Sequence, residues 1–182
     1  YGEHLVLQTT TLAMDQRKDI IVSCLVELLS PKSITLRNDS SMRRPEGLEQ
    51  EIVMVHGDQP NPFTVSHRDS VFEIDPANGQ KTGLYLDIMD SYQKVARLAP
   101  GKKVLDLFCN QGGFSLACAL AGAQSVRAVD ISEDATTAAA KNAELTGVQI
   151  ETITANAFDF LRKHDETYDL IILDPPSFTR NK

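Results

Sequence analysis

The most informative part of the sequence is Val104-Leu105-Asp106-Leu107-Phe108-Cys109-Asn110-Gln111-Gly112-Gly113-Phe114-Ser115. Its apolar first half predicts a buried strand, and its paired glycines predict a tight turn before a helix. A parallel strand whose carboxyl end points at such a turn opens a crevice where the backbone can approach a ligand closely. The stretch therefore predicts an α/β domain with a ligand site at this turn.

The residues around this stretch continue the alternation of strand and helix. Strands are predicted at 104–108, 126–130, 150–154 and 168–174, and helices at 87–98, 114–123, 132–147 and 158–163. Such alternation is typical of a parallel sheet covered by helices. Residues 79–182 are therefore predicted to form a Rossmann-like α/β domain.

The chain before the turn signal Asn78-Gly79 has a different pattern. Short strands are predicted near 4–12, 33–37, 51–55, 63–66 and 70–75, the later ones as an antiparallel hairpin or meander. Asp15 is predicted to cap a helix with one apolar stripe made of Ile20, Ile21, Cys24, Leu25, Leu28 and Leu29. We therefore expect a small α+β domain over residues 1–78.

Composition limits the class of protein. The 182 residues are 42% apolar, which is ample for a packed core, and no apolar run is long enough to span a bilayer. Three cysteines without a CxxC pair favour a reduced, cytoplasmic protein with no metal site. The net charge of −7 argues against a surface that binds nucleic acid over its whole extent. The basic residues of the first domain are expected on a solvated surface: Arg17, Lys18, Lys32, Arg37, Arg43 and Arg44.

The glycine spacing separates two classes of nucleoside cofactor. The G-x-G-x-x-G pattern of nicotinamide dehydrogenases is absent, whereas Gly112-Gly113 after Asp106 suits a cofactor with an amino-acid tail. Asp106 would meet the ammonium group of that tail, directly or through water. The alternative is a strand-end aspartate that caps a helix beside packing glycines. The residues predicted to contact the cofactor here are Asp106, Phe108, Cys109, Asn110, Gly112 and Gly113.

The ends of the next two strands extend this prediction. Asp130 follows Asp106 by 130 − 106 = 24 residues, close to the spacing of about 20 for a ribose-binding acid. Beside the glycine turn, we predict that Asp130 holds the ribose and that its neighbour Ile131 contacts the cofactor. The alternative is a strand-end aspartate that caps the next helix. The Asn156 side chain and the Ala157 amide are predicted to meet the adenine, with an ordinary turn asparagine as the alternative.

The sequence Asp174-Pro175-Pro176-Ser177-Phe178 predicts a second part of the site, because it follows the last strand. The prolines fix the backbone and leave carbonyls free to accept from an exocyclic amine, while Phe178 offers a face for base stacking. We therefore predict Asp174, Pro175 and Phe178 as catalytic residues. The alternative is a strand ended by proline with a core phenylalanine. Lys81 and Tyr85 are predicted to cover the cofactor, or else to belong to a plain linker.

With these residues in view, the chain resembles the class I S-adenosylmethionine (SAM)-dependent methyltransferases, and in particular the bacterial 23S rRNA methyltransferases of the RlmI type. The motifs that carry the resemblance are Lys81-Thr82-Gly83-x-x-Leu86-Asp87, Asp106-Leu107-Phe108-Cys109-x-x-Gly112-Gly113-Phe114, Asp130, Ala157-Phe158-Asp159 and Asp174-Pro175-Pro176-Ser177-Phe178. Two positions depart from the family pattern: Asn156 stands where aspartate is common, and Ile88-Met89-Asp90 replaces a Gln-Arg-Glu-like stretch.

The resemblance implies a SAM-dependent enzyme that methylates RNA, with cytosine C5 of 23S rRNA as the expected target and a homodimer left open. It also implies a PUA RNA-binding domain before Tyr1 and a catalytic cysteine after Lys182. Because the apolar strand 170–173 would otherwise be an exposed sheet edge, we expect further residues or a partner to cover it.

Two other functions stay open. Guanine N7 or an adenine amine could be the target, since a nitrogen attacks SAM directly and needs no cysteine. A non-catalytic RNA-binding module of the same fold is the alternative from another class.

Overall fold

A computed structural model of the chain describes residues 1–58, 62–76 and 84–176. Packing divides the chain into two compact units. The first unit comprises Tyr1–Val65 and Ile74–Leu84, and the second comprises Ser66–Glu73 and Tyr85–Lys182. The predicted turn at Asn78-Gly79 lies outside the described residues. No helix among the described residues is long and apolar enough to cross a membrane.

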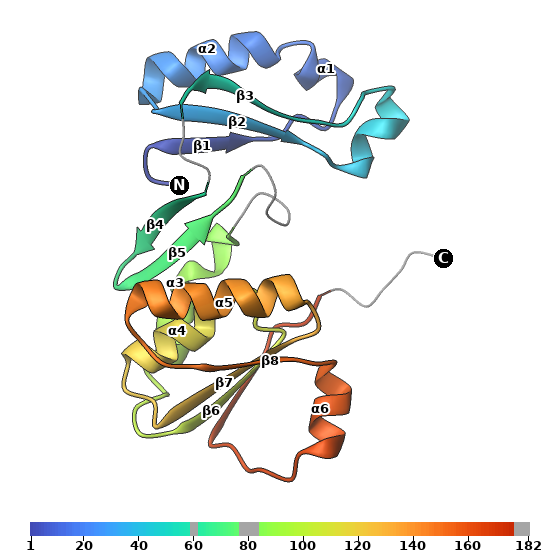
Figure 1. Ribbon diagram of the computed structural model, residues 1–182. Coiled ribbons are helices and arrows are strands. Elements are labelled where there is room, and N and C mark those ends of the chain that lie inside the picture. The colour runs from blue at the N-terminus through green and yellow to red at the C-terminus, as the bar shows by residue number, and fades with distance from the viewer. Residues whose placement is uncertain (59–61, 77–83, 177–182) are drawn as a thin grey trace. The chain divides into compact units, whose positions relative to one another are not determined.

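The second unit contains a four-stranded parallel sheet (Figure 1). Its strands are β6 (Lys103–Leu107), β7 (Ser125–Asp130), β8 (Glu151–Thr154) and β9 (Leu170–Leu173). They lie in the order β8-β7-β6-β9, so β6 has β7 on one side and β9 on the other. The predicted Rossmann-like parallel sheet is confirmed, and each strand begins or ends within two residues of its predicted bounds.

Helices cover both faces of this sheet. The helical segments are η2 (Leu86–Ile88), α3 (Met89–Ala96), α4 (Gly113–Leu120), α5 (Glu133–Thr146) and α6 (Ala157–Lys163). Successive strands are added in one direction from β6 to β8, and β9 is then added on the other side of β6. The right-handed crossovers therefore put α4 and α5 on one face and α6 on the other (Figure 1). The point where the strand order reverses lies between β6 and β9, which is where ligands bind in open α/β sheets.

Alternate residues of β6 supply the two halves of the core. Val104 packs with Cys118 of α4, Val126 and Ile172 on one face. Leu105 and Leu107 pack on the other face with Val129, Ala157 and Phe160. The near-continuous apolar sequence of β6 follows from this, because a central parallel strand is buried on both faces.

Both ends of α5 are capped, by Ser132 and by Gly147. The Ser132 hydroxyl accepts a hydrogen bond from the Ala135 amide at 3.3 Å, which satisfies one free amide of the first turn. Gly147 ends the helix with a φ of 76°, a left-handed conformation that favours glycine.

The first unit contains a mixed three-stranded sheet. Its elements are β1 (His4–Leu7), α1 (Leu12–Asp15), α2 (Lys18–Leu29), β2 (Ser33–Asn38), η1 (Ser41–Glu46) and β3 (Glu51–Gly57). β1 pairs with β2 in parallel, and β2 pairs with β3 antiparallel. β4 (Phe63–His67) and β5 (Ser70–Ile74) form a separate two-stranded sheet, in which Ser66–Glu73 belong to the second unit. Only Arg68 and Asp69 connect these strands, so they form a hairpin.

Two predictions about the first helix are wrong. Asp15 ends α1, and the cap position of α2 is Arg17, which makes no side-chain cap. The Asp15 carboxylate instead accepts from Thr9 Oγ1 at 2.9 Å and from Arg43 Nη1 at 2.8 Å. An unpaired buried guanidinium would destabilise the fold more than an uncapped helix end does, so Asp15 pairs with Arg43.

The predicted apolar stripe of α2 also differs from the side that packs. Ile20, Leu28 and Leu29 are 65%, 77% and 60% exposed. The half-buried side of the helix is formed by Ile21, Val22, Leu25 and Val26. Helical spacing allowed either side to pack because most of this helix is apolar, and the fold uses the side that includes both valines.

Arg37 and Arg43 are buried, whereas the sequence predicts them on a solvated surface. Arg43 is only 2% exposed and donates to the carbonyl oxygens of Thr9 and Glu49 as well as to Asp15. Arg37 donates to Asp39 at 2.7 Å and to the Pro76 carbonyl at 2.8 Å. The loss of hydration of each guanidinium is offset by these hydrogen bonds.

Candidate cofactor site

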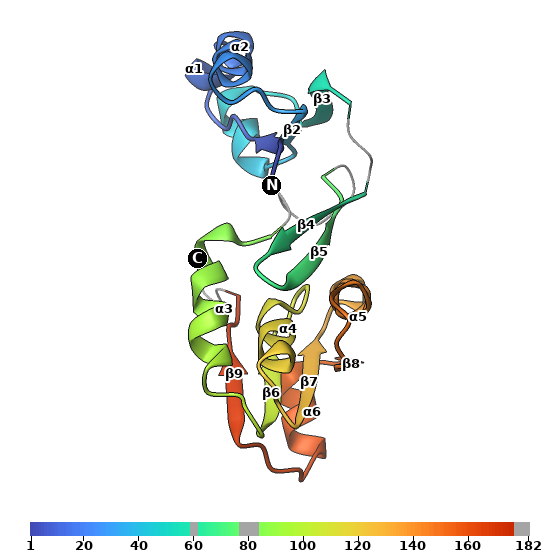
Figure 2. The ribbon, with the colours of Figure 1, turned by 90° about the vertical axis from the view of Figure 1, so that its left-hand side faces the viewer.

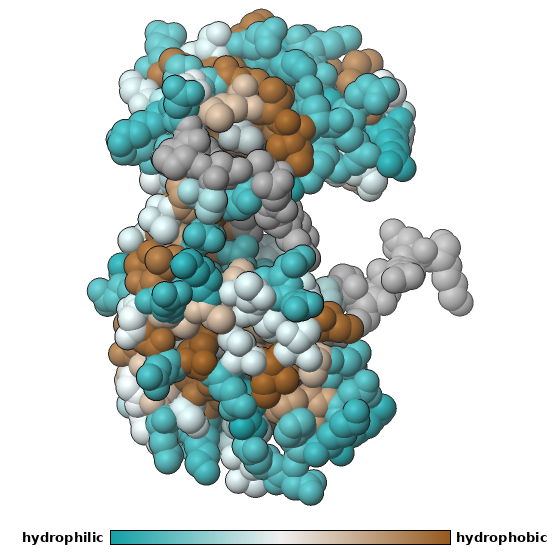
Figure 3. Space-filling model, in the orientation of Figure 1, coloured by the Kyte–Doolittle hydropathy of each residue, from teal (hydrophilic) through white to brown (hydrophobic). Residues whose placement is uncertain are grey.

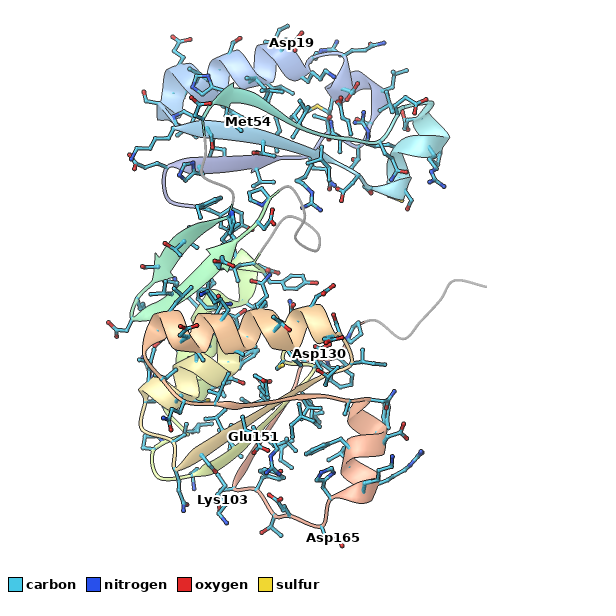
Figure 4. All side chains as sticks on the ribbon, viewed as in Figure 1. Asp19, Met54, Lys103, Asp130, Glu151 and Asp165 are labelled. Atoms are coloured by element: carbon cyan, nitrogen blue, oxygen red, sulfur yellow. The ribbon has the colours of Figure 1, made fainter. Side chains whose placement is uncertain are left out.

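The carboxyl ends of the four parallel strands meet at one edge of the sheet. The residues just after or at these ends are Phe108, Asp130, Asn156 and Asp174, which follow β6, β7, β8 and β9. Figure 4 labels Asp130 at this edge and Lys103 and Glu151 at the opposite edge, where β6 and β8 begin. The topology therefore places the predicted acids along one side of the second unit.

The segment after β6 has an unusual backbone conformation. Phe108 and Asn110 have φ angles of 64° and 48°, and Gly112, the N-cap of α4, has a φ of 83°. Non-glycine residues in the left-handed region cost about 1 kcal/mol or more each, so such a turn persists only when its surroundings determine it. We call residues 108–113 the glycine turn.

Backbone and side-chain hydrogen bonds hold the glycine turn. The Cys109 amide donates to the Val129 carbonyl of β7 at 3.1 Å, and the Gly112 amide donates to the Cys109 carbonyl at 2.8 Å. The Asn110 amide donates to Asp130 Oδ2 at 2.9 Å. The turn is thus tied to the next strand as well as to itself.

The two glycines permit close packing of neighbouring elements. A Cβ atom on Gly112 would lie 3.0 Å from the Ala139 Cβ of α5. A Cβ atom on Gly113 would lie 2.3 Å from the ring of Tyr92 in α3, which is a steric clash. The glycines therefore let α3 and α5 approach the turn, in addition to any close approach of a ligand.

Asp106 is a buried carboxyl on the α4 side of the sheet. It is 1% exposed, and its Oδ2 accepts from Ser115 Oγ of α4 at 2.6 Å. Burial raises the pKa of Asp106 from 3.8 to about 7, with smaller contributions from the charges of Asp174 and Asp130. Its Oδ1 is buried and makes no hydrogen bond.

An unpartnered buried carboxylate oxygen fits a cationic ligand group. An ammonium group at Oδ1 would supply the missing hydrogen bond and favour the ionised form of Asp106. The chemistry of the site is therefore compatible with the amino-acid tail of SAM. Without such a cation, the same burial disfavours the charge on Asp106.

Both oxygens of the Asp130 carboxylate accept hydrogen bonds from backbone amides. Oδ2 accepts from the Asn110 amide at 2.9 Å, and Oδ1 accepts from the Ser132 amide at 3.0 Å. The N-cap of α5 is Ser132, so the capping alternative for Asp130 is wrong, and its carboxylate instead ties the glycine turn to the residue that caps the helix. A carboxylate has about four acceptor positions, so capacity remains for two hydroxyl groups. Ile131 beside it is 67% exposed and lies at the same strand end.

Asn156 caps α6. Its Oδ1 accepts from the Phe158 amide at 2.9 Å and from the Asp159 amide at 3.4 Å, as in the alternative interpretation of a local asparagine. Ala157 is buried in the core between α6 and the sheet, with Leu105 and Leu107. The Phe158 ring is 53% exposed and meets the Phe108 ring edge to face, with ring centroids 6.5 Å apart. Phe108 of the glycine turn thus forms an aromatic pair with Phe158 of α6.

Asp174 and Pro175 are exposed and follow β9 directly. The Asp174 charge contributes to the raised pKa of both Asp106 and Tyr92, although burial is the larger cause for each. Tyr85, whose side chain is 40% exposed, precedes η2 and also acts on the pKa of Tyr92. Lys81 and Phe178 lie outside the described residues.

Two of the three cysteines are placed as core residues. Cys118 is fully buried in α4, and Cys109 is 6% exposed in the glycine turn. Burial raises the pKa of both thiols, to about 12 for Cys118 and higher for Cys109, and the charge of Asp106 acts in the same direction. The thiolate is the nucleophilic form of cysteine, so neither residue is suited to attack a substrate.

Sequence reasoning missed two residues that shape this site. Ser115 binds Asp106 from α4, and its signal was its position on the buried side of the helix. Tyr92 is 6% exposed, and burial raises its pKa to about 12, with Asp174 and Asp106 contributing. No local pattern marks Tyr92, because its contact with Gly113 joins residues far apart in the chain.

Comparisons with known proteins identify the family. The profile of the S-adenosylmethionine-dependent methyltransferases matches residues 44–182. The ribosomal RNA large subunit methyltransferase I of Shewanella amazonensis is 36% identical over the whole chain, and that of Photobacterium profundum is 34% identical. The chain spans about half of the length of these relatives, 48% in each case.

A solved methyltransferase structure also resembles this fold. SMU.776, described as a candidate methyltransferase and solved in complex with SAH (S-adenosylhomocysteine), is 25% identical and superposes with a TM-score of 0.84. That similarity covers 100% of this chain and 48% of the solved one. Because the profile covers well over half of the chain, and because the parallel sheet with its glycine turn has the expected topology, the chain belongs to the S-adenosylmethionine-dependent methyltransferases.

Proposed function

We propose that this chain is part of an enzyme that transfers a methyl group from SAM to a base in ribosomal RNA. The observation that carries the proposal is the buried, unpartnered Oδ1 of Asp106 beside the glycine turn. A buried carboxylate oxygen without a hydrogen-bond partner fits an ammonium group, and the neighbouring Asp130 fits ribose hydroxyls. A cofactor with an amino-acid tail and a nucleoside carries both groups. The names of the curated relatives support rRNA as the substrate.

The residues of the sheet edge would each take one part of the cofactor. Asp106 would hold the ammonium, and Asp130 with Ile131 would hold the ribose. Asn156, Ala157 and the exposed ring of Phe158 would lie near the adenine. The left-handed residues of the glycine turn would bring backbone close to the cofactor. Bound SAM supplies an electrophilic methyl group.

Asp174 and Pro175 would position the target base. Their exposed position after β9, on the side of the strand order reversal, leaves room for a base to approach the cofactor edge. Lys81 and Phe178, as residues predicted from the sequence, would cover the cofactor and stack on the base. The target that we propose is cytosine C5 of 23S rRNA, by resemblance to the family.

Guanine N7 or an adenine amine is the second candidate target. Methylation of cytosine C5 needs a thiolate that adds to the ring, and burial suppresses the thiolate of both Cys109 and Cys118. The C5 chemistry would therefore require a thiol from another segment of the enzyme, whereas a nitrogen nucleophile would not. A ring or amine nitrogen attacks SAM by itself.

The partners follow from this chemistry. We propose RNA as the binding partner and the cytoplasm as the compartment, because rRNA and SAM meet there. A homodimer is compatible with the proposal and is not required by it.

Calorimetric titration of SAM into the chain and into two variants tests the cofactor assignment. Asp130→Ala should weaken binding about tenfold or more, because it removes the ribose acceptor and the support of the Asn110 amide (about 1.4 kcal/mol per tenfold). Asp165→Ala, an exposed acid near the opposite edge, serves as the matched control (Figure 4). Equal affinity of Asp130→Ala and the wild type would remove the ribose assignment.

The experiment that identifies the target atom uses the full-length enzyme. Nucleoside mass spectrometry of 23S rRNA, incubated with the full-length enzyme and SAM, should detect 5-methylcytidine. A 7-methylguanosine or methyladenosine product would replace the C5 proposal by the second candidate. Absence of SAM binding with RNA binding intact would favour the non-catalytic RNA-binding module.

A further inference from the structure

One buried asparagine connects the glycine turn to the β4–β5 hairpin. Asn142 of α5 is 0% exposed, and both ends of its amide are used. Its Nδ2 donates to the Gln111 carbonyl in the glycine turn at 3.0 Å. Its Oδ1 accepts from the Glu73 amide of β5 at 2.8 Å. A single side chain thus binds two segments 38 residues apart (111 − 73 = 38).

The next turn of α5 adds a second connection to the hairpin. Thr146 Oγ1 accepts from the Val71 amide at 3.0 Å and donates to the Val71 carbonyl at 3.3 Å. Asn142 and Thr146 are four residues apart, so they lie on the same face of α5. Side chains of α5 therefore form hydrogen bonds with backbone groups of β5, as the backbone of a neighbouring strand would. β5 runs beside α5 in Figures 1 and 2.

The glycine turn needs such external support. Phe108 and Asn110 are held at positive φ, a conformation that they would leave without contacts that determine it. On the β7 side, Val129 and Asp130 provide those contacts. On the α5 side, the Gln111 carbonyl is bound by Asn142, and Gly112 lies against Ala139 one turn earlier in the helix.

We propose that Asn142 is a positioning residue that holds the glycine turn in its SAM-binding conformation and couples that conformation to the docking of the β4–β5 hairpin on α5. Loosening of the hairpin would disturb Asn142 through the Glu73 amide, and the turn would then lose its support on the α5 side. The inference rests on the proposed binding of SAM at this turn.

Two substitutions separate the two ends of the connection. Asn142→Asp keeps an oxygen for the Glu73 amide but loses the donor to the Gln111 carbonyl and places a carboxylate against it. Thr146→Val keeps the size of the side chain and removes the two bonds to Val71, far from the turn. We expect Asn142→Asp to weaken SAM binding about tenfold and Thr146→Val about threefold, measured by calorimetry well below the unfolding temperature.

The double variant tests the coupling. If Asn142 carries the effect, Thr146→Val will weaken SAM binding in the wild type but not in the Asn142→Asp background, so the two effects will not add. Amide hydrogen exchange should show faster exchange of the glycine-turn amides in both single variants. A purely structural role would lower the thermal stability without this local change and without a change in SAM affinity.

Three results would overturn the inference. They are unchanged SAM affinity of Asn142→Asp, additive effects in the double variant, and unchanged exchange of the turn amides. Failure of the wild type to bind SAM would count against the proposed function instead, and the hydrogen exchange would still report whether Asn142 holds the turn.

Discussion

Replacement of Asp106 by asparagine should stabilise the fold while it removes cofactor binding. Burial raises the pKa of this carboxyl from 3.8 to about 7. Each pKa unit corresponds to 1.36 kcal/mol, so the ionised carboxylate destabilises the folded state by at most about 4 kcal/mol. An asparagine side chain has nearly the same shape and carries no charge.

The sign of the pH dependence follows from proton binding. Between pH 3.8 and about 7 the folded chain holds the Asp106 proton and the unfolded chain does not. The free energy of unfolding therefore falls as the pH rises through this interval, and the penalty is constant above it. Asp106→Asn has no ionisable group at this position, so its free energy of unfolding lacks this pH dependence. The variant should therefore gain no stability over the wild type near pH 4 and gain the most at pH 8.

The asparagine amide reduces the gain. Its oxygen can accept from Ser115, but its NH₂ group would occupy the place of Oδ1, which has no partner, at a cost of about 1–3 kcal/mol. A net gain of about 1–3 kcal/mol at pH 8 remains. For a chain of this size that gain raises the unfolding temperature by about 2–10 °C.

Thermal unfolding of the wild type, Asp106→Asn and the exposed control Asp165→Asn at pH 4, 6 and 8 provides the measurement. The difference between Asp106→Asn and the wild type should grow with pH, whereas the control should follow the wild type. SAM titration should show binding by the wild type and a loss of about a hundredfold for Asp106→Asn. A variant less stable than the wild type at pH 8, or a pH-independent difference, would refute the argument from burial.

Three further outcomes are expected. Gly113→Ala should lower stability by about 1–3 kcal/mol, because the new Cβ would lie 2.3 Å from the buried Tyr92 ring, and Tyr92→Leu should recover part of that loss in thermal unfolding. A thiol reagent should modify only the exposed Cys24 in the folded chain, since the other two thiols are buried, and fast reaction of more than one thiol would contradict this placement. Arg43→Ala should cost about 3–5 kcal/mol in denaturant unfolding, because the half-buried Asp15 carboxylate would lose its partner, and a loss below 1 kcal/mol would show that the pair is solvated.

The apolar surface of the second unit is uneven. Ile171 and Leu173 on the edge strand β9 are 50% and 63% exposed, whereas Ile172 between them is 7% exposed. Figure 3 shows apolar patches among polar surface on the face that it presents. The alternation follows from the period of two in a strand with one covered face. Among the described strands β9 lies at the edge of the sheet, and the covering of this edge that the sequence analysis expects stays a prediction.

The local sequence was enough to predict the strands and helices of the second unit, and it also led to the candidate site at the ends of the strands. A run such as Val104–Leu107 is apolar because a central parallel strand is buried on both faces, and the Gly112-Gly113 pair marks where that strand must turn. The same pattern placed acids at the ends of neighbouring strands. These features depend on residues close together in the chain, so they can be read from the sequence.

Long-range packing, which the sequence pattern does not show, sets the environment of those residues. Whether Asp106 is a solvated cap or a buried carboxyl depends on its 1% exposure, which α4 and its neighbours impose. The tie between Asn142 and Gln111, the clash that keeps position 113 a glycine, and the burial of Arg43 join segments that are distant in sequence. Hydrophobic periodicity cannot reveal such contacts, because burial of a polar group is set by the partners that long-range packing brings to it.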